Sequence, residues 1–165
     1  MVDRYEIRLA GTGGQGLILA GIIIGEGACI YDDKNAVQTQ SYGPEARGGM
    51  SKSDVIVSPR EINYPKAESF DCLLVLSQRS ATHYINKVKP RGIVIYDRDE
   101  VQELPRVGNY RPVGFPIVQT ARNDIGRVIV TNIVSLGVLR DITDIVSRAA
   151  LEKALLNRVP KGTEE

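Results

Sequence analysis

The stretch Gly11-Thr12-Gly13-Gly14-Gln15-Gly16 joins an apolar run typical of a β-strand, residues 5–10, to a long apolar run typical of a buried helix, residues 15–30. Glycines at such a junction allow a tight turn, and they expose amide hydrogens at a helix N-terminus, where phosphate is favoured. The stretch therefore predicts a Rossmann-like first βα unit. It serves either as a backbone site for phosphate or as a close contact between the strand and the helix.

Strands and helices alternate along the rest of the sequence. Further strands are expected at residues 36–40, 51–58, 72–76 and 93–96, with a short one at 110–113. Helices are expected from Ser77 or Ser80 to Lys87, from a cap at Asp124 to Leu139, and from Asp144 to Arg158. This order predicts an α/β fold, a three-layer α/β/α sandwich around a mostly parallel or mixed central sheet.

Length and composition are typical of one globular unit. The chain has 165 residues, of which 42% are hydrophobic and 25% charged, so we expect a single domain over residues 1–160 and a short polar tail at 161–165. A net charge of +1 and few aromatic residues disfavour nucleic acid as a partner. The longest apolar run, residues 17–30, is too short and too interrupted for a membrane span, and the N-terminus lacks the order of a signal peptide. We therefore expect a cytoplasmic protein.

The residues that most often bind metals or act as bases are few. Cys29 and Cys72 are far apart and each lies among apolar neighbours, so the sequence predicts two buried, reduced thiols and no iron–sulfur or zinc site. His83 is the only histidine and has no recognisable partner, so we expect it at or near the surface rather than as a catalytic base.

The glycine triplet alone leaves several functions open. In a dinucleotide-binding unit an acidic residue ends the second strand, whereas here Asp32 and Asp33 precede that strand and Thr39-Gln40 end it. A Walker-type loop would close with a lysine followed by serine or threonine, which this loop lacks. The glycines also fit a purely structural role, in which they only let the first strand and helix pack closely.

A second glycine-flanked segment follows, Gln40-Ser41-Tyr42-Gly43-Pro44-Glu45-Ala46-Arg47-Gly48-Gly49. It holds a carboxylate and a guanidinium between flexible glycines. Glu45 and Arg47 can pair with each other at the surface, or Arg47 can hold a phosphate or a partner carboxylate in a two-pronged contact. The residues themselves do not decide between these alternatives.

Three segments together resemble a known family. They are Gly11 to Gly16, Gln40 to Gly49, and the helical Thr131-Asn132-Ile133-Val134-Ser135-Leu136-Gly137. In order and spacing they are similar to the gamma subunit, or gamma domain, of 2-oxoacid:ferredoxin oxidoreductases, which act on pyruvate, 2-oxoglutarate, branched-chain oxoacids and indolepyruvate. The Tyr-Gly-Pro-Glu-x-Arg-Gly-Gly string is more specific than any glycine triplet, and the resemblance covers most of the chain.

The resemblance implies one part of a larger enzyme. Such complexes decarboxylate a 2-oxoacid on thiamine diphosphate, pass electrons through iron–sulfur clusters to ferredoxin and transfer the acyl group to coenzyme A. The family places these cofactors on or with alpha, beta and ferredoxin-like delta partners, so this chain is expected to bind no cofactor or metal alone and to supply no catalytic residue. Overall similarity favours 2-oxoglutarate as the substrate, and the alternative is a free-standing nucleotide-binding domain.

We expect the two glycine loops to lie together at the carboxyl ends of the central strands and to form one patch for a cofactor or a partner subunit. Asn132 can reach that patch from its helix, or it can bond locally within the helix. The expected patch consists of Gly11, Gly13, Gly14, Gln15, Gly16, Tyr42, Gly43, Glu45, Arg47, Gly48, Gly49 and Asn132.

Overall fold

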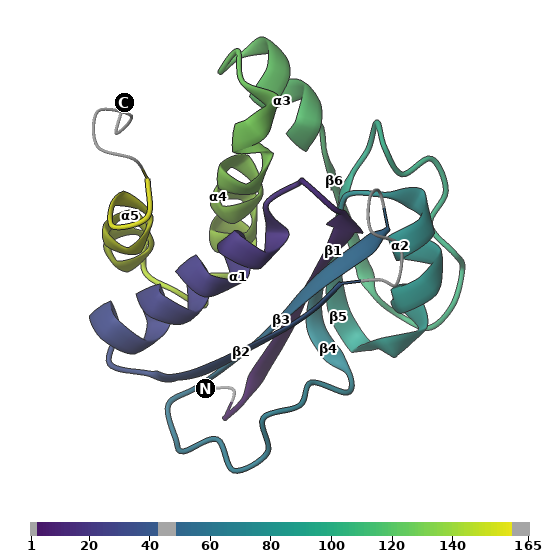
Figure 1. The fold of residues 1–165 in the computed structure, drawn as a ribbon. Helices are drawn as coiled ribbons and strands as arrows, with labels where there is room; N and C mark the ends of the chain where they lie inside the picture. The colour runs from purple at the N-terminus through teal and green to yellow at the C-terminus, as the bar shows by residue number, and fades with distance from the viewer. Residues whose placement is uncertain (1–2, 43–48, 160–165) are drawn as a thin grey trace.

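A computed structural model of the chain describes residues 3–42 and 49–159 (Figure 1). Its middle layer is one six-stranded sheet. The strands are β1 (Tyr5–Thr12), β2 (Asn35–Tyr42), β3 (Met50–Ser58), β4 (Phe70–Val75), β5 (Val88–Asp97) and β6 (Arg111–Phe115). They lie in the order β2-β3-β1-β4-β5-β6. Strand β3 is antiparallel to both neighbours and the other pairs are parallel, so the sheet is mixed.

Helices cover both faces of this sheet. They are α1 (Leu17–Glu26), α2 (Gln78–Tyr84), α3 (Ile117–Asn123), α4 (Thr131–Thr143) and α5 (Arg148–Leu156). Short turns are the π-helical η1 (Gly27–Tyr31) and the 3-10 helices η2 (Ile85–Lys87) and η3 (Val128–Val130). Helices α1, α4 and α5 lie on one side of the sheet and α2 on the other (Figure 1). The predicted three-layer α/β fold is thereby confirmed.

The core follows from the alternation of side chains along the strands. Ile7 and Leu9 of β1 point toward α1, while the neighbouring Arg8 points toward α2. Strand β4 is apolar on both faces because helices cover it on both sides: Leu74 belongs to the α1-side core and Leu73 to the α2-side core.

Two predicted helix starts are wrong, because each aspartate ends a helix instead of beginning one. Asp124 does not begin a helix but is the C-cap of α3. Asp144 is the C-cap of α4, in the left-handed region at φ 51°, and Ser147 caps α5 instead, its hydroxyl accepting from the Ala150 amide at 3.2 Å. Asp144 ends α4 in the left-handed region, which aspartate tolerates, whereas Asp124 ends α3 with a right-handed backbone at φ −90°, so an aspartate can end a helix as well as begin one.

One of the two predicted buried thiols is exposed. Cys72 lies in the core on β4, and burial raises the pKa of its thiol to about 12. Cys29 is exposed, because the π-helical turn η1 carries it to the surface at the end of α1. His83 is exposed too, and its ring meets the Tyr84 ring edge to face with centroids 4.7 Å apart. No helix within the described ranges is long and apolar enough to cross a membrane.

Candidate functional site

The glycine loop and the start of β3 meet at one edge of the sheet. Because β3 runs antiparallel to β1, its first residue, Met50, pairs with Thr12 at the end of β1. The Gly13 amide donates a hydrogen bond to the Gly49 carbonyl at 3.0 Å. The structure therefore brings the first glycine segment against the end of the second, at the carboxyl ends of β1 and β4.

Gln15 holds the loop from within. Its Oε1 accepts from the Thr12 amide at 2.8 Å, and its Nε2 donates to the Leu76 carbonyl, just past β4, at 3.3 Å. A Cβ atom on Gly11 would lie only 2.1 Å from this Oε1, so only glycine at position 11 leaves room for the inward side chain. Gln15 is thus a positioning residue for the loop.

Asn132 reaches the loop from α4. Gly16 has φ 73°, and a Cβ there would lie 2.8 Å from Asn132 Nδ2. The Asn132 side chain also bonds locally, its Oδ1 accepting from the Ile133 amide at 3.0 Å. Both alternatives raised by the sequence therefore apply to Asn132, which packs on the loop and bonds within its helix.

The tip of the loop differs from its two ends. Gly13 and Gly14 are exposed, and Gly14, with φ 93°, has open space where a side chain would stand. Gly11 and Gly16 are required for close packing, as the structural alternative predicts. The exposed tip is the part of the loop that another molecule can approach.

Hydroxyl groups from other elements complete the loop; the sequence suggested Ser80 only as a helix cap and did not single out Ser51. Ser80 Oγ donates to the Gly11 carbonyl at 3.3 Å, and Ser51 Oγ donates to the Thr12 carbonyl at 3.4 Å. Single serines on α2 and β3 carry no motif, so only the fold identifies these contacts.

The remaining predicted site residues belong to the second segment. Tyr42 ends β2, where it pairs with Ser51 of β3, and Gly49 is buried beside the loop. Gly43, Glu45, Arg47 and Gly48 lie outside the described residues. The contacts of Glu45 and Arg47 stay a prediction.

The arrangement does not favour a dinucleotide site. In such sites the second strand lies beside the first and parallel to it, whereas here β2 is an edge strand separated from β1 by β3. The amides of Thr12, Gly13 and Gln15 already donate within the chain. These three amides of the loop are thus engaged by the protein itself and not free to hold a phosphate.

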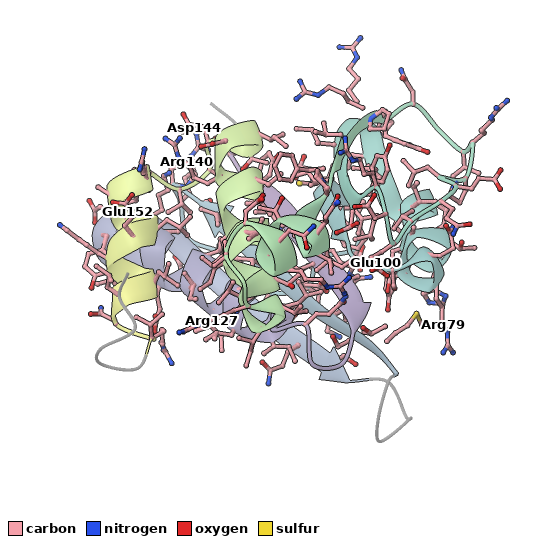
Figure 2. The ribbon with its side chains drawn as sticks, turned by 90° about the horizontal axis from the view of Figure 1, so that it is seen from above. Arg79, Glu100, Arg127, Arg140, Asp144 and Glu152 are labelled. Carbon is pink, nitrogen blue, oxygen red and sulfur yellow. The ribbon has the colours of Figure 1, made fainter. Side chains whose placement is uncertain are left out.

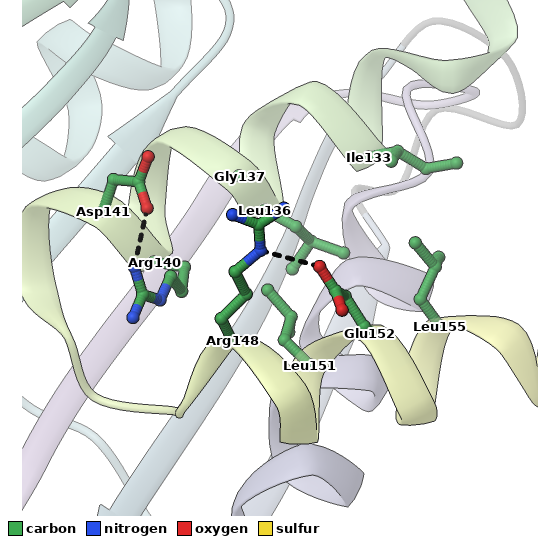
Figure 3. Close-up of a pocket in the computed structure, with 9 residues that line it drawn as sticks. All are labelled: Ile133, Leu136, Gly137, Arg140, Asp141, Arg148, Leu151, Glu152 and Leu155. Carbon is green, nitrogen blue, oxygen red and sulfur yellow. Dashed lines mark hydrogen bonds and ion pairs between the residues drawn. The ribbon is translucent and has the colours of Figure 1, made fainter.

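A separate hollow of about 330 Å³ lies between α4 and α5 (Figure 3). Its walls are apolar and its rim is charged; the lining residues are Ile133, Leu136, Gly137, Arg140, Asp141, Arg148, Leu151, Glu152 and Leu155. The rim charges are paired, since Arg148 Nε lies 2.7 Å from Glu152 Oε1 and Arg140 Nη1 lies 2.9 Å from Asp141 Oδ1. Figure 2 shows Arg140 and Glu152 on one flank and Arg79 of α2 on the opposite flank.

The fold and the loop describe one class of protein: a three-layer α/β domain whose glycine loop is held by hydrogen bonds within the chain and exposes its tip at one edge of the sheet. Within residues 3–42 and 49–159 there is no group of three or more His, Cys, Asp or Glu side chains that could hold a metal ion. The chain belongs to the pyruvate ferredoxin/flavodoxin oxidoreductase family, which it matches over residues 6–165. It is of the gamma-subunit type of the 2-oxoacid:ferredoxin oxidoreductases, as the three motifs predicted.

Relatives of similar length support this assignment. The chain is 50% identical to the 2-oxoglutarate synthase subunit KorC of Methanocaldococcus jannaschii over 98% of its own length and 87% of that protein. It is 46% identical to the KorC subunit of Methanothermobacter marburgensis, covering 98% of this chain and 90% of that one. The crystal structure of a keto/oxoacid ferredoxin oxidoreductase gamma subunit from Geobacter sulfurreducens PCA matches with a TM-score of 0.88 and 51% identity, over 96% of this chain and 86% of that one.

Proposed function

We propose that this chain is the gamma subunit of a 2-oxoglutarate:ferredoxin oxidoreductase and that it contributes a docking surface rather than catalytic groups. The similarity to two 2-oxoglutarate synthase subunits over nearly the whole chain supports 2-oxoglutarate as the substrate of the complex. The observation that carries the docking role is the self-bonded glycine loop, in which Gln15 occupies the Thr12 amide and the Leu76 carbonyl. A loop so fixed loses little conformational freedom when a partner binds.

In this proposal the complex oxidatively decarboxylates 2-oxoglutarate, transfers the succinyl group to coenzyme A and passes two electrons to ferredoxin. Thiamine diphosphate and the iron–sulfur clusters belong to alpha, beta and delta partners in the cytoplasm. The described part of this chain does not fit a cluster, because Cys72 is enclosed in the core and Cys29 lies apart from it at the surface. Its share would be assembly, together with contacts to coenzyme A along the glycine patch.

Purification from the native host tests the function directly. An affinity-tagged copy of the chain is expected to co-purify with thiamine- and cluster-containing subunits. The purified complex is expected to reduce a viologen dye with 2-oxoglutarate and coenzyme A faster than with pyruvate, 2-oxoisovalerate or indolepyruvate. A solitary chain, or a preference for another oxoacid, would contradict the proposal.

Variants at the loop tip test the docking role. Gly14→Asn adds a side chain at an exposed position with positive φ, where asparagine is tolerated. Gly108→Asn is the matched control, because Gly108 also has positive φ, 70°, and open space. We expect Gly14→Asn and Arg47→Ala to impair assembly or succinyl-CoA formation while Gly108→Asn assembles normally. If all three variants assembled equally well, the glycine loops would not be part of the interface.

A further inference from the structure

A half-buried lysine lies on the α2-side face of the sheet, and the part of the chain that the structure describes gives it no ion-pair partner. Lys52 of β3 stands level with Ala10 of β1 and Ser41 of β2. Its ammonium lies 5.9 Å from the centre of the Tyr84 ring. Within residues 3–42 and 49–159, no carboxylate lies within ion-pair distance, 4.0 Å, of the Lys52 ammonium.

The nearest acidic group on this face is already neutralised. Asp54, two residues along β3, accepts two hydrogen bonds of 2.6 Å from Arg8. Burial lowers the pKa of Lys52, and the positive charges of Arg8 and Lys87 lower it further, while the Asp54 carboxylate offsets part of this by raising it. The group of Lys52, Lys87, Arg8 and Asp54 therefore carries excess positive charge in a partly desolvated position.

The same face is open to a partner. Helix α2 packs over β1 and β4, while Thr39 and Ser41 of β2, which share this face with Lys52, are exposed. The surface also continues into the glycine patch, since Lys52 is two residues from Met50, which pairs with Thr12. A partner seated on the glycine tip would therefore lie next to Lys52.

We propose that Lys52, supported by Lys87, receives the carboxylate of an acidic side chain of a partner subunit. This inference rests on the proposed function. A partly buried cation gains from a paired carboxylate, and an acidic group of another chain supplies one that the described residues do not. A small phosphate ligand fits less well, because the guanidinium near Lys52, that of Arg8, already donates to both Asp54 oxygens, and the other neighbour is an aromatic ring rather than a concave cradle of amides. The pair would orient the docked subunits and accelerate their encounter.

Affinity measurements on the complex provide the test. The partner subassembly is purified without this chain, and wild type, Lys52→Met, Lys52→Arg and Lys66→Met are titrated against it. Lys66 is an exposed lysine before β4, so Lys66→Met makes the same charge change away from the proposed contact. We expect Lys52→Met to weaken binding by about tenfold and Lys52→Arg to stay within about threefold. Lys66→Met should bind as wild type does.

Three further readouts separate docking from a structural role. Because Lys52 has no ion-pair partner within residues 3–42 and 49–159, Lys52→Met should melt at the same temperature as wild type or higher, although it binds more weakly. Wild-type binding should also weaken more steeply with added salt than that of Lys52→Met. A carbodiimide, which joins a lysine to a carboxylate in direct contact, should link Lys52 to an Asp or Glu of the partner, located by mass spectrometry.

Several outcomes would overturn the inference. It fails if Lys52→Met binds like Lys66→Met, or if Lys52 in the wild-type complex couples to no partner carboxylate. It also fails if inorganic phosphate or pyrophosphate binds the isolated wild-type chain saturably and Lys52→Met abolishes that binding, which would make the site one for small anions. Failure of the wild-type chain to bind oxoacid oxidoreductase subunits would instead contradict the proposed function itself.

Discussion

The two faces of the sheet are stabilised in different ways. On the α1 side three helices cover aliphatic side chains such as Ile7, Leu9 and Leu74. On the α2 side a seven-residue helix covers a core that also contains a buried ion pair, Arg8 with Asp54. One face depends on apolar packing, and the other depends on charges whose removal from water must be compensated by close partners.

The charged face is arranged so that Arg8 is fully enclosed. Its guanidinium lies 4.3 Å from the centre of the Phe70 ring and 4.6 Å from that of Tyr84, and its side chain is 4% exposed. The arginine guanidinium stacks well on aromatic rings, so the two rings replace part of the hydration that Arg8 loses on burial. A charge placed this way is costly to leave unpaired, so the two faces should differ most in their response to loss of a charged side chain.

The largest effect is expected from removing one member of the pair. Arg8→Met leaves the Asp54 carboxylate buried without a cation, and we expect a loss of about 3–5 kcal/mol in the free energy of unfolding. Urea denaturation of the isolated chain measures this loss. The double variant Arg8→Met/Asp54→Leu removes both charges and should regain most of it; a loss below about 1 kcal/mol for the single variant would mean that the pair does not hold this face.

The next effect tests how closely the α1 side is packed. A Cβ on Gly21 of α1 would lie 2.0 Å from Ser53 Oγ of β3, a hydroxyl that accepts from Gln38 Nε2 at 2.9 Å. Gly21→Ala should therefore displace Ser53 and cost a net of about 1–2 kcal/mol, after the gain in helix propensity. Thermal melting of the variant gives the measurement.

Gly25, one turn further along α1, is the matched control. Its added Cβ would meet only Gln38 Cβ at 4.0 Å, which is ordinary contact. Gly25→Ala should stabilise the chain by up to about 1 kcal/mol through helix propensity alone. If both variants shifted stability in the same direction, close packing of α1 on β3 would not be the cause.

This contrast also marks what sequence can predict. The strand and helix pattern was readable because apolar periodicity depends on local residues, and it identified every strand of the sheet. Helix ends were less readable, as Asp124 and Asp144 show, because an aspartate fits either end of a helix. In the sequence Gly21 and Gly25 look equally suited to a close helix contact. Only the opposing strand shows that Gly21 is required and Gly25 is not.

The same limit applies to the site. The glycine segments were found from sequence because their residue types are unusual. Their division into packed ends and an exposed tip depends on Gln15 and Asn132, which approach from different elements. Lys52 was not singled out, because an isolated lysine in a strand carries no signal until Tyr84 and Arg8 are seen beside it.

A third effect compares the buried pair with a carboxylate on the α1 side, Asp32, whose cation is partly exposed. The Asp32 carboxylate accepts from the Ser147 amide and hydroxyl, both at 2.6 Å, and lies 3.6 Å from Lys34 Nζ. Burial alone would raise the pKa of Asp32, but the Ser147 hydrogen bonds and the Lys34 charge lower it. We expect Asp32→Asn to cost about 1 kcal/mol at neutral pH, less than Arg8→Met because the cation it leaves unpaired, Lys34, is partly exposed.

The pH dependence of this effect has a definite sign. A carboxyl whose pKa is lowered by folding stabilises the protein above its unfolded pKa and loses that contribution as the pH falls through the folded value. The gap in stability between wild type and Asp32→Asn should therefore be constant from neutral pH down to about pH 5 and should close below about pH 4. A gap that widened on acidification would contradict the assignment.

The smallest effect concerns a glycine that the chain itself does not require. Gly137 lies inside α4, is exposed, and an added Cβ there would meet nothing within 4 Å. Glycine inside a helix costs stability relative to alanine, so Gly137→Ala should raise the free energy of unfolding by about 0.5–1 kcal/mol. The measurement is urea denaturation beside Gly25→Ala, and the two gains should be similar because both depend on the helix backbone. A loss of stability for Gly137→Ala would show that the open space beside α4 is filled in solution, and that the α1 side is packed more tightly there than at Gly25.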